Sequence, residues 1–172
     1  MPKLTPLEDD AYSAAHDGVH RTVLEILRAH FGPTAVVQQQ IGDYTGLTKS
    51  VPASNLAAVA AASLTADHAR TQAGQWVRAA RAEGTSWTQL ATALRFNDDQ
   101  DGDLAELAFE TVAGKPEPLE KKSITWDCGT CGAAVIDYGP YERNPQDDEK
   151  GHTEDCARHQ AAIADYDAAT GQ

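Results

Sequence analysis

The three cysteines of this chain share one metal-binding spacing with a histidine. Cys128 and Cys131 are separated by two residues, twenty residues then separate Cys131 from His152, and Cys156 follows His152 by four positions. A thiolate pair two residues apart suits a tetrahedral ion, because backbone N–H groups of the intervening turn point at the sulfurs and offset their charge. A closed set of four protein ligands leaves no position for a catalytic water. The pattern therefore predicts one structural Zn²⁺ ion.

His159 is the competing fourth ligand. With His159 the pattern becomes C-x-x-C followed by C-x-x-H, and both histidines reach the same region because neighbours three or four positions apart share a helix face. We prefer His152, since its position in a loop leaves the side chain free to turn toward the ion. Two alternatives to a structural zinc site remain: the three cysteines could be inert buried thiols, or they could hold a catalytic zinc ion.

Two strands and a helix are expected to position these ligands. Residues 123–127 and 133–138 have the alternating, β-branched and aromatic character of a strand and its returning partner. Thr153 can cap a helix that extends to residue 168, which would place Cys156 in the first turn. The expected order is ββα.

This module, residues 124–172, resembles zinc fingers of the Cys-Cys-His-Cys type. In that family the hairpin carries the C-x-x-C pair and the start of the helix carries H-x-x-x-C. The resemblance covers residues 124–168 and departs from the compact fingers in a long insertion at residues 139–151. It implies a module that folds around its metal, so that Cys128→Ser would unfold it and leave the helical domain intact.

Helical periodicity dominates the chain before this module. A first helix is expected over residues 7–30, where Gly32 and Pro33 stop it. Residues 34–52 have no sustained period and are interpreted as a loop, with a short strand or helix near residues 35–41 as an option.

Three serine or aspartate residues are expected to cap the helices that follow. Ser54 begins a long alanine-rich segment that reaches Glu83, with a break at Gly74 or residues 65–67 as an alternative to one continuous helix. Ser86 caps a short helix through Leu94. Asp103 caps another over residues 104–112.

Residues 75–96 resemble the first two helices of a bacterial helix-turn-helix. The family phrase W-x-x-L-A-x-x-L-G, followed by a hydrophobic residue, is matched except that Arg95 stands where the family prefers glycine. The matching core positions are Trp87, Leu90, Ala91, Leu94 and Phe96. The resemblance implies a helix-turn-helix-like core over residues 69–112.

The segment that would read bases is acidic. It holds no basic residue and six carboxylates, those of Asp98, Asp99, Asp101, Asp103, Glu106 and Glu110. Base readout relies on Arg, Lys, Asn or Gln with cationic support to phosphates, and a net charge of -12 repels the DNA backbone. We therefore expect a helical scaffold that serves another purpose, with DNA binding disfavoured by charge.

Two further patterns carry metal-ligand residue types. Positions one, three, five, six and eight of an EF-hand calcium loop are matched by Asn97, Asp99, Asp101, Gly102 and Leu104. Ala108 occupies the place of the bidentate glutamate, which favours an acidic, solvated turn. His16 and His20, with Glu25 nearby, faintly match H-E-x-x-H. Asp17 replaces the general-base glutamate and Gly18 weakens the helix, so exposed helix histidines are preferred to a metalloprotease site.

Composition and residue order predict a mostly α protein in two parts. Of the 172 residues 41% are hydrophobic, with much alanine and few aromatic residues, which favours closely packed helices. We expect a helical domain at residues 1–113, a Gly- and Pro-containing linker at 114–123, and the ββα zinc module at 124–172.

Several function classes are disfavoured by what the sequence lacks. It contains no nucleotide-binding loop, no G-x-S-x-G elbow and no spare cysteine nucleophile, so an enzyme is not expected. It has no signal-like segment and no membrane-length apolar run, so we expect a cytoplasmic protein with no membrane contact. The alanine-rich composition resembles that of actinobacterial small proteins that pair such helices with a cysteine-rich tail. The expected function is a non-catalytic regulatory or adaptor protein with a protein partner; a helix-turn-helix transcription regulator is the alternative.

Overall fold

A computed structural model describes residues 9–44, 46–96, 102–115, 117–118 and 120–171. The mostly α fold is confirmed, and the chain divides into two compact units, Met1–Thr71 and Gln72–Gln172, each of which is described by itself. The division falls inside a helix and not at the predicted linker of residues 114–123. The reason is that the helices after Thr71 share a core with the C-terminal module.

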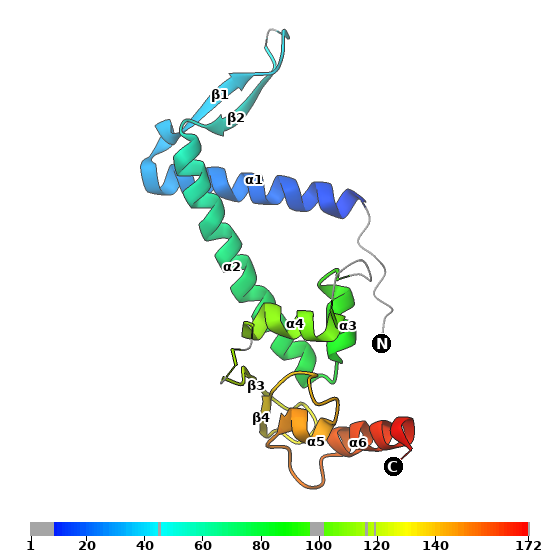
Figure 1. The fold of residues 1–172 in the computed structure, drawn as a ribbon. Helices are drawn as coiled ribbons and strands as arrows, with labels where there is room; N and C mark the ends of the chain where they lie inside the picture. The colour runs from blue at the N-terminus through cyan, green and yellow to red at the C-terminus, as the bar shows by residue number, and fades with distance from the viewer. Residues whose placement is uncertain (1–8, 45, 97–101, 116, 119, 172) are drawn as a thin grey trace. The chain divides into compact units, whose positions relative to one another are not determined.

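The first unit contains two helices and a β-hairpin (Figure 1). Its elements are α1 (Asp9–Phe31), the short 3-10 helix η1 (Pro33–Ala35), β1 (Val36–Gln40), β2 (Thr48–Pro52) and the first part of α2 (Asn55–Ala82). The first helix is confirmed. Residues 34–52 form a hairpin and not a plain loop: β1 lies where a short strand was considered, and the pairing strand β2 was not expected. β1 and β2 pair antiparallel, from Val36 opposite Pro52 to Gln40 opposite Thr48. Most of β1 is exposed and polar, so the strands lack the apolar alternation that would have revealed them.

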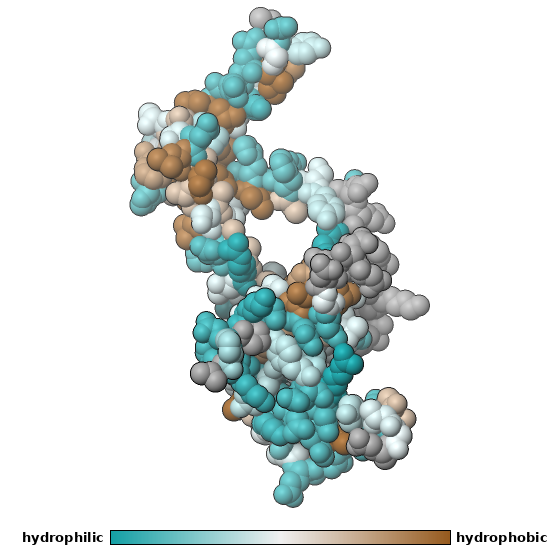
Figure 2. All heavy atoms as spheres, viewed as in Figure 1, coloured by the Kyte–Doolittle hydropathy of each residue, from teal (hydrophilic) through white to brown (hydrophobic). Residues whose placement is uncertain are grey.

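The first unit has a small core and much exposed apolar surface. Val23, Leu24 and Leu27 of α1 are buried with Ala61 of α2. Around them many large apolar side chains face solvent, and Figure 2 shows brown patches along these elements. The exposed residues are Tyr12, Val19, Phe31, Val37, Ile41, Tyr44, Leu47, Leu56, Val59 and Leu64.

Helix α2 is continuous through both positions at which a break was considered. The Ser54 hydroxyl accepts a hydrogen bond from the Ala57 N–H at 3.3 Å, which confirms the predicted cap. Gly74 remains helical. A Cβ atom there would lie 3.2 Å from Arg78 Nη1 and 3.7 Å from Val112 Cγ1, so the site has little spare room but an ordinary contact with Val112.

The second unit begins with the end of α2 and two shorter helices, α3 (Trp87–Ala93) and α4 (Leu104–Ala113), which pack together (Figure 1). Ser86 and Gln89 form a complete capping box on α3, and the Asp103 carboxylate accepts from the Ala105 N–H at 2.9 Å on α4. Both predicted caps are confirmed. Residues 94–103 separate the two helices, a longer connection than the turn of about three or four residues in a helix-turn-helix.

The C-terminal module is larger than the expected ββα order. A three-stranded antiparallel sheet runs in the order β3 (Ile124–Asp127), β4 (Ala134–Asp137), β5 (Glu149–Lys150), with the short helix α5 (Pro145–Asp148) before β5 and α6 (Ala157–Thr170) after it. The insertion at residues 139–151 thus supplies α5 and the third strand. Thr153 does not cap α6: its carbonyl accepts from the Cys156 N–H at 3.1 Å, and Cys156 itself occupies the N-cap position.

One hydrophobic core joins the helices of this unit to the module. Trp87 and Phe109 from α3 and α4 are buried with Trp126 and Val135 from the sheet. The Gly129 N–H donates to the Ala82 carbonyl at 3.1 Å, and a Cβ atom at Gly129 would lie only 2.9 Å from that oxygen. The module and residues 72–113 therefore share one core, from which we expect them to unfold together in place of the separate unfolding that the resemblance implies.

A buried carboxylate lies at the centre of this shared core. Asp137 is fully buried, and Arg81 Nε donates to its Oδ2 at 2.8 Å. The indole N–H groups of Trp87 and Trp126 donate to the same carboxylate at 3.2 Å, and the Gly139 N–H donates at 2.9 Å. These donors come from α2, α3, β3 and the turn after β4. A buried charge requires such partners, so the carboxylate fixes where the elements meet.

Removing Arg81 from its ion pair with Asp137 should strongly lower the stability of the fold. Arg81→Leu leaves the buried Asp137 carboxylate without its counter-charge, and we expect a loss of about 3–5 kcal/mol in the free energy of unfolding, measured by urea titration. Arg70→Leu on the same helix is the control, because the Arg70–Asp67 pair is exposed and should contribute less than about 1 kcal/mol. Equal losses in the two variants would contradict the structural role of Arg81.

Two glycines with similar positive φ angles allow steric fit to be tested separately from backbone strain. Gly139 has φ +85 and an added Cβ atom would lie 2.7 Å from Phe109 Cγ, whereas Gly114 has φ +88 and no heavy atom within 4 Å of that position. Both alanine variants should lose roughly 1–3 kcal/mol, because a positive φ of this size is strained for a residue with a Cβ atom. Gly139→Ala should lose about 1–3 kcal/mol more from overpacking. Thermal and urea unfolding would measure the difference, and similar values would show that the Phe109 contact is easily relieved.

Candidate metal centre

Cys128, Cys131, His152 and Cys156 bring their ligand atoms within 4.8 Å of one another. The Cys128 and Cys156 sulfurs are 3.9 Å apart, and the Cys131 sulfur lies 3.7 Å from His152 Nδ1. The first two residues belong to the turn between β3 and β4, His152 follows β5, and Cys156 precedes α6. The four side chains predicted from the spacing are therefore together, in an arrangement that could hold a metal ion.

The turn between β3 and β4 holds the Cys131 sulfur in surroundings that favour its metal-binding thiolate form. The Gly132 N–H donates to the Cys128 carbonyl at 2.7 Å, and Gly132 has φ 72, which requires the conformational freedom of glycine. Backbone N–H groups of Thr153 and Ala133, followed by the His152 side chain, lower the pKa of Cys131 to about 5. Its thiol is thus ionised at neutral pH, and the thiolate is the form that binds metals.

His152 is held so that one nitrogen faces the thiol cluster. Its Nε2 lies 2.8 Å from Glu149 Oε2, while Nδ1 points toward Cys131. When Nε2 carries the ring proton and donates it to the carboxylate, Nδ1 keeps its lone pair for a metal. The Trp126 ring contacts the imidazole edge-on, and the His159 ring stacks on it at 4.4 Å between centroids.

Glu149 connects the metal centre to the helices. Arg81 donates to its Oε1, and Arg158 Nη1 donates to its Oε2 at 3.2 Å. Burial alone would raise the pKa of Glu149, but the two guanidinium groups and His152 lower it overall. Arg81 therefore bonds at once to Asp137 in the core and to the carboxylate that orients His152.

His159 is adjacent to the four-residue group formed by the three cysteines and His152 but is not a member of that group. It shares a second cluster with Glu149 and His152, in which one ligand atom of each lies within 4.8 Å of the others. Its Nδ1 is buried without a hydrogen-bond partner among the described residues, 3.9 Å from Glu149 Oε2. Burial, followed by the nearby His152, lowers the pKa of His159 and favours the neutral ring. Because Glu149 is already neutralised by two arginines, the cysteine-containing group is the better metal site.

The other predicted metal patterns do not assemble in the described residues. His16 Nδ1 lies 3.5 Å from Asp17 and His20 Nε2 lies 3.3 Å from the Ser50 carbonyl, and neither joins a metal-capable group there. Residues 97–101 of the calcium pattern lie outside the described residues. Of its remainder, Asp103 caps α4 and Ala108 is fully buried in the core.

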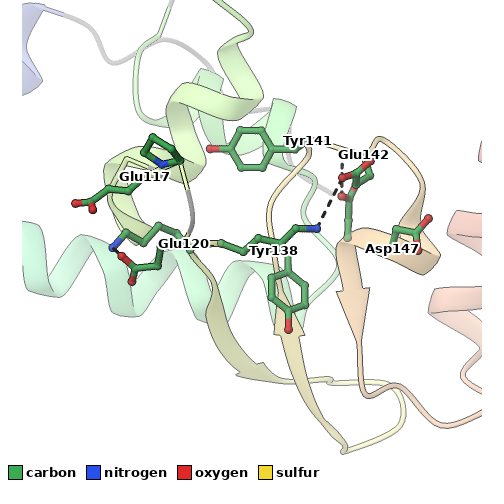
Figure 3. A pocket seen from close by; sticks show the side chains of 10 residues that line it. Glu117, Glu120, Tyr138, Tyr141, Glu142 and Asp147 are labelled. Carbon is green, nitrogen blue, oxygen red and sulfur yellow. Dashed lines mark hydrogen bonds and ion pairs between the residues drawn. The ribbon is translucent and has the colours of Figure 1, made fainter.

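A cavity of about 420 Å³ is lined by residues that follow α4 and by residues that follow the end of β4 (Figure 3). Tyr138 and Tyr141 line it, and Lys121 Nζ reaches to 3.8 Å from Glu142 Oε1. Asp148 also lines it without an ion-pair partner among the described residues. Burial, with the nearby Asp137 and Glu142, raises the pKa of Asp148 to about 6.

The residues around the metal ligands escaped sequence analysis, although two of them carried a signal. Asp137 occupies the buried face of β4, where alternation with Val135 called for an apolar residue. Arg81 lies four positions after the buried Val77 on the apolar stripe of α2. A charged residue at each of two apolar positions indicates a buried ion pair. Glu149 gave no such signal, because β5 contains only two residues.

Replacing each histidine separately tests the ligand set. His152→Ala removes a ligand atom from the four-residue group, and we expect metal affinity to fall by roughly 10- to 100-fold or more, measured by competition with a chromophoric chelator. His159→Ala removes only the stacked ring and should have a much smaller effect. If His159→Ala lost more affinity than His152→Ala, the ligand set would be C-x-x-C with C-x-x-H.

Because the pKa of Asp148 is raised, we expect Asp148→Asn to increase the free energy of unfolding at neutral pH but not at low pH. Its folded pKa of about 6 lies above the ordinary value of 3.8, so the stability present at low pH is lost as pH rises through 6. Asp148→Asn avoids this loss and should raise the free energy of unfolding at pH 7.5 by about 1 kcal/mol after allowance for solvent screening, with no gain near pH 4. Asp147→Asn, at an exposed residue paired with Lys150, is the control. A gain at pH 4 as large as that at pH 7.5 would refute the titration.

Comparison with protein-family models, curated proteins and solved structures finds no match for this chain. Within the described residues, none of the helices combines the length and the apolar character that crossing a membrane requires. The function is therefore argued from the residues and their arrangement.

Proposed function

We infer that this protein is a non-catalytic, zinc-stabilised adaptor or regulatory protein that engages a protein partner. The observation that carries the proposal is the convergence of Cys128, Cys131, His152 and Cys156. A tetrahedral Zn²⁺ with Zn–S bonds of about 2.3 Å and Zn–N bonds of about 2.0–2.1 Å separates two sulfurs by about 3.8 Å and a sulfur from a nitrogen by about 3.6 Å. The corresponding separations here are 3.9 Å and 3.7 Å.

The donor set favours zinc and a structural role. Three thiols with one imidazole are soft and borderline ligands that select Zn²⁺ over the oxygen-seeking Mg²⁺ and Ca²⁺. Four protein ligands fill a tetrahedral ion, which leaves no open position for substrate. The Glu149 carboxylate behind His152 is the outer partner that metal-ligating histidines usually have. Bound zinc would tie the β3–β4 turn to the start of α6.

The partner surface that we favour lies on the first unit. Large exposed side chains such as Leu56 and Val59, 82% and 66% exposed, are unusual on a surface that meets only water. A helix of another protein with an apolar face would cover them. Helix α4, by contrast, presents Glu106 and Glu110 and has no basic residue, which disfavours contact with DNA phosphates.

The second candidate is a helix-turn-helix regulator of transcription. It is favoured by the burial of Trp87, Leu90 and Ala91, which are the core positions of the helix-turn-helix phrase. Arg95 also supports it, because its φ of 68 is the left-handed conformation that the family's glycine would adopt. The acidic α4 and the long connection before it weigh against this candidate.

Partner capture with matched variants tests the proposal. The full chain, loaded with zinc, is cross-linked in lysate, and retained proteins are identified by mass spectrometry. Leu56→Ser with Val59→Ser should lose the specific partner while zinc content and helicity stay unchanged. Trp76→Ser, at a residue that is 67% exposed in the second unit, should keep it. Retention of no specific protein, together with sub-micromolar binding of duplex DNA, would instead favour the regulator.

A further inference from the structure

The first unit brings three cations around one cavity although the sequence contains no basic cluster. Arg21 and Arg28 of α1 and Lys49 of β2 line a cavity of about 410 Å³. The two arginines lie seven residues apart on one face of α1, and α1 and β2 are in contact. Lys49 belongs to β2, a strand that was not predicted from the sequence. The proximity of Lys49 to the two arginines is therefore visible only in the structure.

These cations leave nearby carboxylates unused. Arg21 lies four residues after Asp17 and four before Glu25, positions at which ion pairs commonly form on a helix. Neither Arg21, Arg28 nor Lys49 forms an ion pair within the described part of the chain. Other cations of the chain do so, such as Arg70 with Asp67. Within the described residues, no carboxylate is ion-paired with these three side chains in competition with an external anion.

The remaining lining residues add donors and one carboxylate. The Ser50 hydroxyl accepts from Gln38 Nε2 at 3.0 Å, which leaves its own proton free to donate. His20 Nε2 lies 3.3 Å from the Ser50 carbonyl, and Leu24 forms an apolar floor. Asp17 is the carboxylate among the lining residues. The lining thus holds three basic side chains and one carboxylate, in a chain whose net charge is -12.

We propose that this cavity binds phosphate groups through Arg21, Arg28 and Lys49. A guanidinium presents paired N–H donors that match two phosphate oxygens, and an ammonium adds a point charge. Arg21 and Arg28 are about 10.5 Å apart along the helix axis, a spacing over which two phosphates of one ligand can each meet one guanidinium. A small organic diphosphate and a nucleic-acid backbone share this chemistry.

The site shares no residue with the zinc centre, nor with Leu56 and Val59 of the apolar surface assigned to a protein partner. Its residues belong to the first unit, whereas the metal ligands belong to the second. Loss of phosphate binding would leave the adaptor proposal standing, and failure of partner capture would leave this site standing.

Calorimetry with inorganic pyrophosphate and fluorescence anisotropy with a short DNA duplex, both on the full zinc-loaded chain at low salt, test the proposal. We expect at least one probe to bind, and Arg28→Gln and Lys49→Gln each to weaken it by about tenfold or more. Arg70→Gln, an exposed arginine outside the cavity, is the matched control and should bind like the parent. Pyrophosphate binding alone identifies a small ligand, and duplex binding alone identifies a nucleic-acid backbone; either supports the site. No binding of either probe, or equal affinities in the Arg28, Lys49 and Arg70 variants, would overturn it.

Discussion

The buried carboxylate of Asp137 is the constraint around which the second unit is arranged. A fully buried charge is stable only when donors surround it, and here they come from α2, α3, β3 and the turn after β4. Arg81 supplies the counter-charge and also bonds to Glu149, the carboxylate behind His152. The Arg81 guanidinium thus links the aromatic core to the candidate metal centre. If Arg81 moved away, both Asp137 in the core and Glu149 beside His152 would lose a positively charged partner.

This link changes how the C-terminal module should be understood. Compact zinc fingers fold around their ion alone, but here Trp126 and Val135 share a core with Trp87 and Phe109. The turn that carries Cys128 and Cys131 also rests on the end of α2, through the Gly129 N–H and the Ala82 carbonyl. The energy of metal binding would therefore stabilise the helices as well as the sheet.

The sequence predicted best what depends on local spacing and least what depends on contacts between distant segments. Ser54, Ser86 and Asp103 were identified as caps because a cap is a local pattern, and the Cys and His residues came together as their spacing implied. The β1–β2 hairpin was missed because its strands are polar and exposed. The role of Arg81 depends on Asp137, a partner 56 residues away that no local pattern can name.

The central claim, that the metal centre and the helices of residues 72–113 form one cooperative structure, is tested most directly by hydrogen exchange. Amide exchange would be followed by mass spectrometry in the full zinc-loaded chain and again after a chelator has removed the metal. The account predicts that α3 and α4 lose protection together with β3 and β4, while α1 is unaffected. Loss of protection confined to residues 124–172, with α3 and α4 unchanged, would contradict it.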